Sequence, residues 1–185
     1  MRHPVPIIVL AQLFGTSLWF SANSAADDLV RQWGISAADI GVLTNAVQLG
    51  FIVGTLIFAI SGLADRFAAS RIFAVCAVAG AAANAAFALL ATGMSAGVPL
   101  RFIVRLCLAG VYPLGMQLIV SWVPERAGSA LALQNAIGFA ITMVSIHLGT
   151  AWIGTWQSDI AWLLLPGPLL GLLGLAPLWR RRHLS

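Results

Sequence analysis

Long apolar stretches constrain the fold of this chain more than any other feature. They are rich in Leu, Ile, Val, Ala, Phe and Gly, and charged side chains are nearly absent from them. A helix needs about 20 apolar residues to cross ~30 Å of hydrocarbon, and in lipid only a helix satisfies its backbone hydrogen bonds within one segment. We therefore expect an all-α membrane protein with six transmembrane helices at 5–24, 38–60, 72–92, 98–122, 128–150 and 160–179.

The composition excludes a soluble domain, because 60% of the 185 residues are hydrophobic and only 9% are charged. No Ser-His-Asp order, zinc spacing or phosphate-binding loop is present, so we expect no enzyme, cofactor or metal site. Cys76 and Cys107 fall at different depths of their predicted helices, which argues against a disulfide. The expected surroundings are a lipid bilayer, and we expect no nucleic-acid partner.

The arginines predict the topology. If the N-terminus is cytoplasmic, only Arg31 falls in an outer loop, and seven arginines fall inside: Arg2, Arg66, Arg71, Arg126, Arg180, Arg181 and Arg182. Cytoplasmic loops carry an excess of Lys and Arg. The pattern predicts a multi-pass protein of the cell (inner) membrane with both termini in the cytoplasm.

The loop between the second and third predicted helices reads SGLADRFAASR over 61–71. It resembles the signature loop of the major facilitator superfamily, roughly G-x-L-A-D-R-x-G-R-R. Four positions match: Leu63, Ala64, Asp65 and Arg66. The departures are Ser61 and Ala68 in place of the glycines, and Ala69-Ser70 in place of the basic pair, with Arg71 just beyond.

A second stretch, 101–115, resembles the R-x-x-x-G-x-x-x-x-G helix of the same family. Arg101 takes the place of the motif arginine, and Arg105 stands where the family usually has Gly. The segment 121–128 resembles the family's short link between its fourth and fifth helices. The antiporter motif of the fifth helix is absent.

The resemblance implies a half of the family architecture, which has twelve helices in two halves, each made of inverted three-helix repeats. Residues 1–185 would form one half-bundle similar to an N-terminal half. The implied function is transport of a small solute by alternating access, together with a second copy or a C-terminal-half partner. Alternatives are a truncated half that does not transport, a membrane interaction protein or, more remotely, a membrane enzyme with lipid substrates.

The signature loop would carry a gating motif of Asp65, Arg66 and Arg71. In the family, this carboxylate meets a helix N-terminus of the other half, where an anion is favoured by the helix dipole. The alternative is a solvated acid paired with Arg66 or Arg71.

Arg101 and Arg105 are four residues apart and so share one helix face. A charge inside a membrane is costly and usually faces a cavity or a partner. One interpretation is an anion site, which makes an anionic solute the favoured cargo. The other is structural, with Arg101 reaching the interface or pairing with Asp28 or Asp39.

Polar side chains on four of the predicted helices are expected to line a cavity. Gln12, Thr16 and Asn23 share one face, Tyr112 lies on the arginine face, and the others are Asn45, Gln48, Asn135 and Thr142. The alternative for each is an interhelical hydrogen bond. No acid lies deep in a predicted helix, which leaves His147 as the titratable candidate for proton coupling. The alternative for His147 is a polar residue at the membrane interface.

Overall fold

The structure is a computed structural model in which residues 5–17 and 26–132 are described. Within these ranges the chain is helical, without a strand. The helices are α1 (Val5–Ser17), α3 (Ala26–Trp33), α4 (Ala37–Ser61), α5 (Leu63–Arg66), α6 (Ala69–Leu90), α7 (Met94–Leu108), α8 (Tyr112–Trp122) and a short 3-10 helix at Pro124–Arg126.

Three segments of the described chain are long and apolar enough to cross a membrane: Ala37–Ser61, Ala69–Leu90 and Met94–Trp122. They correspond to the second, third and fourth predicted helices, and the last begins four residues before the expected 98. Residues 5–17 of the first predicted helix form α1, and the predicted helices at 128–150 and 160–179 lie almost wholly outside the described residues. The short helices α3 and α5 were expected as loops.

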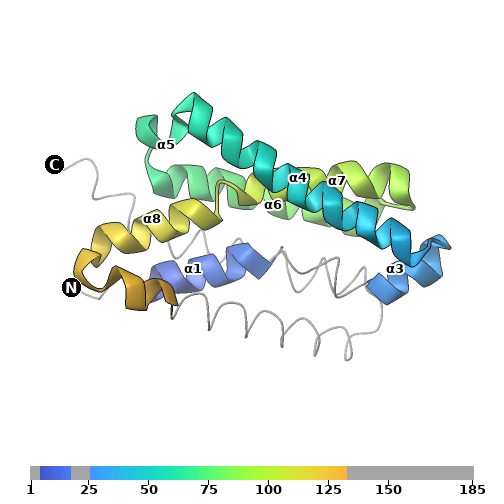
Figure 1. Ribbon diagram of the computed structural model, residues 1–185, viewed down its shortest axis with the longest axis horizontal. Coiled ribbons are helices and arrows are strands. Elements are labelled where there is room, and N and C mark those ends of the chain that lie inside the picture. Colours follow the sequence, from blue (N-terminus) through green and yellow to red (C-terminus); the bar gives the residue numbers. More distant parts are fainter. Residues whose placement is uncertain (1–4, 18–25, 133–185) are drawn as a thin grey trace.

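The spanning segments pack side by side, with α7 antiparallel to α6 and parallel to α4. α7 lies between α4 and α6, while α8 packs against α1 and α6 (Figure 1). Two glycines allow the close approach of α4 to α7. A Cβ on Gly50 would lie 2.3 Å from the carbonyl oxygen of Phe102, and one on Gly54 would lie 2.7 Å from that of Leu106. Small residues that let two helix backbones approach are typical of packing in lipid.

The fourth predicted helix is interrupted between Leu108 and Tyr112. Gly110 and Val111 close tight turns, with their N–H groups donating to the carbonyls three residues earlier at 3.0 Å. Pro113, two residues after Val111, has no N–H to donate to the carbonyl four residues back, so a regular helix does not run through this point. Cys76 packs against Gly110, three residues beyond Cys107, so the two thiols are closer in depth than predicted; both are free.

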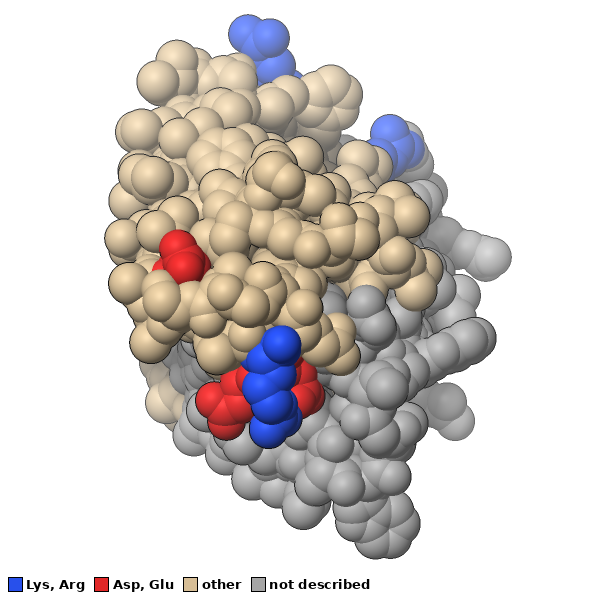
Figure 2. All heavy atoms as spheres, turned by 90° about the vertical axis from the view of Figure 1, so that its right-hand side faces the viewer, with Lys and Arg blue, Asp and Glu red and all other residues tan. Residues whose placement is uncertain are grey.

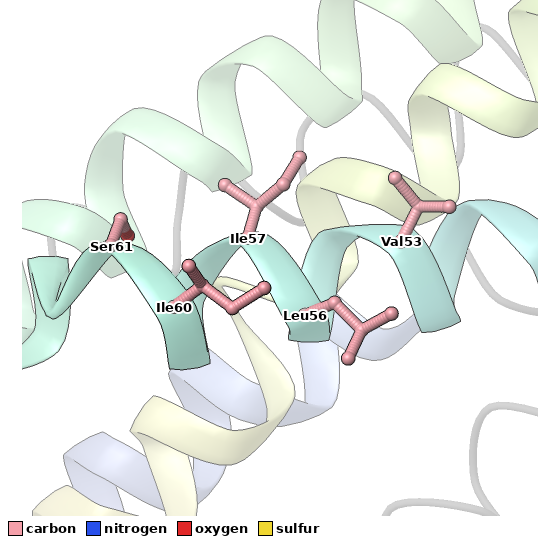
Figure 3. Close-up of a pocket in the computed structure, with 5 residues that line it drawn as sticks. All are labelled: Val53, Leu56, Ile57, Ile60 and Ser61. Atoms are coloured by element: carbon pink, nitrogen blue, oxygen red, sulfur yellow. The ribbon is translucent and has the colours of Figure 1, made fainter.

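The exposed surface of α4 is apolar over its second half. An open hollow there is lined by Val53, Leu56, Ile57, Ile60 and Ser61, whose side chains all come from this one helix (Figure 3). Ile60 is 85% exposed. A large apolar face suits contact with acyl chains or with another apolar protein surface, and it lacks the polar groups that would orient a polar solute.

Candidate functional site

The two arginines of α7 are the most deeply buried charges in the described chain. Arg101 is 1% exposed and Arg105 is 2% exposed. They sit one turn apart on a helix whose neighbouring buried positions, Val104, Cys107 and Leu108, are apolar. Two guanidinium groups are therefore held inside the helix bundle, where a charge is expensive unless polar groups or an anion surround it.

Arg101 is directed towards α6. Its Nη1 donates to Oδ1 of Asn84 at 3.1 Å, and its guanidinium carbon lies 5.2 Å from the centre of the Phe87 ring. Asn84 and Phe87 are both fully buried. Asp28 forms an ion pair with Arg31 instead, and the carboxylate of Asp39 accepts from the backbone N–H and the hydroxyl of Ser36. Arg101 thus connects α7 to α6 through an amide and an aromatic face.

Arg105 lies at the contact between α7 and α4. A Cβ on Gly50 would come within 3.1 Å of the Arg105 Cβ, so the missing side chain of this glycine makes room for the stem of the arginine. The two arginines therefore have different neighbouring helices: Arg101 contacts α6, and Arg105 lies beside α4.

Gln12 of α1 is buried against the interrupted segment. Its Nε2 donates to the Tyr112 carbonyl at 2.9 Å, and a Cβ on Gly115 would fall 1.5 Å from its Oε1. Only glycine at 115 leaves space for this amide. This hydrogen bond joins two predicted cavity residues, Gln12 and Tyr112, but its acceptor is the backbone carbonyl of Tyr112 and not the phenol.

Asn45 and Gln48 lie apart from the arginines on the exposed part of α4. The buried face of that helix is made of Leu43, Ala46, Val47, Gly50 and Gly54. Thr16 lies in α1, and Asn23, Asn135 and Thr142 lie outside the described residues, as does His147.

The predicted gating motif lies where α4 ends. Gly62, with φ of 62°, turns the chain into the single turn of α5, which holds Asp65 and Arg66. Both side chains and Arg71 at the start of α6 are exposed. The left-handed backbone at Gly62 strongly favours glycine, and the turn presents an acid and two bases at the surface.

Neither Asn84 nor Phe87 was among the site residues predicted from the sequence. Asn84 could have been recognised from the sequence, because a single amide within the alanine-rich stretch of α6 needs a hydrogen-bond partner if it is buried. Trp33, the last residue of α3, packs edge-to-face on Phe87, with ring centres 5.9 Å apart.

The family model of the Major Facilitator Superfamily matches residues 8–184. The chain belongs to this superfamily. It is a multi-pass membrane protein, and members of the superfamily are transporters rather than enzymes. The chain is 31% identical over 120 residues to the 4-hydroxybenzoate transporter PcaK of Pseudomonas putida. The match covers 64% of this chain and 26% of the relative, so the chain aligns with a minor part of that protein.

Proposed function

We propose that this chain is a six-helix half of a secondary transporter that moves a small organic anion by alternating access. A second half, either another copy or a C-terminal-half partner, would complete the route. The observation that carries the proposal is the pair of buried guanidinium groups, Arg101 and Arg105, one turn apart on a membrane-spanning segment.

The chemistry of these groups favours a carboxylate. A guanidinium presents N–H donors in a planar fork that fits a carboxylate, and it stays charged when other side chains would lose their proton. The sequence has no acid deep in a predicted helix, so an incoming anion would offset the positive charge. The solute in the relative's name, 4-hydroxybenzoate, has a carboxylate of this kind.

We assign the two arginines different parts. The guanidinium of Arg101 already contacts Asn84 and Phe87, so we assign it to holding α7 against α6. We assign Arg105, one turn deeper, to the solute. The other predicted polar positions would complete the cavity wall: Gln12, Thr16, Asn23, Asn45, Gln48, Tyr112, Asn135 and Thr142.

The exposed signature turn fits a gate. Asp65, with Arg66 and Arg71 nearby, would meet the N-terminus of a helix from the second half and release it as the route reopens. In this proposal the protein lies in the inner membrane with both termini in the cytoplasm, so that this gate is on the cytoplasmic side.

Uptake by the Arg105→Ala variant tests the proposal. The full chain, with its second half, is reconstituted in liposomes and supplied with radiolabelled 4-hydroxybenzoate and benzoate. We expect at least a tenfold loss of uptake, and partial retention in Arg105→Lys, which keeps the charge but not the fork. Arg126→Ala, at an exposed loop position, is the control. Unchanged uptake by a folded Arg105→Ala protein would exclude the assigned role.

A further inference from the structure

The short helix α3 packs across one end of the bundle. Leu29 is fully buried, while the charged side chains Asp27, Asp28 and Arg31 lie on its outer side. Figure 2 faces this end and shows acidic and basic side chains gathered at one spot of a surface that otherwise carries few charges. In the predicted topology this is the outer end of the protein.

The connection to α4 fixes the last residue of α3, Trp33. Gly34, with φ of 61°, turns the chain directly after the indole. Ser36 and Asp39 then form a capping box that starts α4. Few residues separate the indole from a rigid spanning helix, so its position is closely defined.

The indole of Trp33 fills a notch that exists because residue 97 is glycine. A Cβ on Gly97 would lie 2.8 Å and 2.9 Å from two ring carbons of Trp33. The indole also meets Phe87 of α6 edge-to-face, at an interplanar angle of 66°. One side chain of α3 therefore contacts both α6 and α7.

Phe87 connects this indole to the buried charge. Its ring lies beneath the guanidinium of Arg101, which also donates to Asn84. Phe87, Asn84 and Arg101 are each at most 1% exposed in this conformation. Phe87 therefore lies in contact with both the indole of Trp33 and the guanidinium of Arg101.

We propose that Trp33 is a latch: docked in the notch at Gly97, it holds Phe87 against Arg101 and closes this end of the bundle. When Trp33 leaves the notch, Phe87 loses its outer support and a route opens from the α3 end to Arg101. An edge-to-face ring pair contributes modestly to stability, so the latch opens without unfolding of the spanning helices. The latch concerns access to a buried charge and does not depend on which solute is carried.

Thiol labelling of the full chain in nanodiscs tests the latch, because both faces of a nanodisc are open to a charged maleimide. The background carries Cys76→Ala and Cys107→Ala, and Ala88→Cys provides the reporter. Ala88 is fully buried, next to Phe87 and one turn from Asn84 on the same helix. We expect slow labelling of this background, at least tenfold faster labelling after Trp33→Ala or Gly97→Leu, and little change after Trp33→Phe, which keeps a ring.

Two controls separate the latch from general loosening. Gly93→Leu adds the same side chain near the same end, where a Cβ would meet nothing within 4 Å, and it should leave the labelling rate unchanged. A second reporter, Ala77→Cys, is fully buried and distant on α6, and it should stay slow in every variant.

The proposal is overturned if the reporter at 88 already reacts fast with Trp33 in place. It is equally overturned if Trp33→Ala leaves labelling slow, or if the reporter at 77 accelerates as much as the one at 88. Should Gly97→Leu fail to fold, the Trp33→Ala result decides alone.

Discussion

At the scale of single residues, the surroundings of Arg101 explain how a charge is tolerated inside this bundle. Asn84 supplies one acceptor at 3.1 Å and the face of Phe87 supplies a diffuse negative potential. Both come from α6, so the cost of burying the charge is offset by contacts that also hold two spanning helices together. The same side chain therefore serves packing and electrostatics.

Asn84→Ala should lower stability by about 1–2 kcal/mol, because Arg101 loses its amide acceptor inside the bundle. Thermal unfolding of the purified protein in detergent measures the change. Asn45→Ala is the matched control, since this amide is exposed on α4, and its unfolding temperature should stay close to that of the parent. Equal effects of the two substitutions would mean that the contact with Arg101 adds nothing.

At the scale of elements, the contact between α4 and α7 depends on missing side chains. Gly50 and Gly54 bring the two helices close enough for backbone and Cβ atoms to touch. Sequence spacing alone shows small residues one turn apart, a pattern shared by many helices that pack through some other face. The structure shows that α7 packs against Gly50 and Gly54, which gives these two glycines their role in helix packing.

Gly50→Ala should destabilise the protein by about 1–3 kcal/mol, because its methyl group would overlap the Phe102 carbonyl and push the helices apart. Gly41→Ala in the same helix is the control. Nothing lies within 4 Å of a Cβ there, so the higher helix propensity of alanine should leave stability unchanged or raise it by up to about 1 kcal/mol. Unfolding in a denaturing detergent compares the two, and a stabilising Gly50→Ala would contradict the close contact.

At the scale of the whole molecule, the chain aligns with 26% of its transporter relative, and the proposed route lies between two halves. The exposed Asn45 and Gln48 on α4, and the exposed signature turn at Asp65, are surfaces that a second half would cover in this proposal. Assembly is therefore the property on which transport depends.

The detergent-corrected mass of the purified chain, measured at several concentrations, tests this assembly. We expect a stable dimer of the 19.5 kDa chain or a stoichiometric complex with another half. A strict monomer at every concentration, with no partner recovered from membranes, would replace the transport proposal with a non-transporting half or a membrane interaction protein.

Much of the fold was predictable from the sequence because lipid imposes strong rules. The length and apolarity of the stretches placed the second, third and fourth spanning segments, and the motif residues around Asp65 and Arg101 indicated the superfamily that the family model confirms. The presence of six transmembrane helices and the predicted cavity-lining residues remain predictions. Asn23, Asn135, Thr142 and the last two predicted helices lie outside the described residues.

By itself, the sequence determined that the chain is helical, apolar and able to span a membrane, because these properties follow from composition within each segment. It also marked Arg101 and Arg105 as unusual, since a charge among apolar neighbours is visible without a fold. Only the tertiary structure decided that Arg101 meets Asn84 and Phe87, and that Trp33 docks at Gly97. Those contacts join residues from different helices, and their partners depend on how the helices rotate and cross, which packing sets.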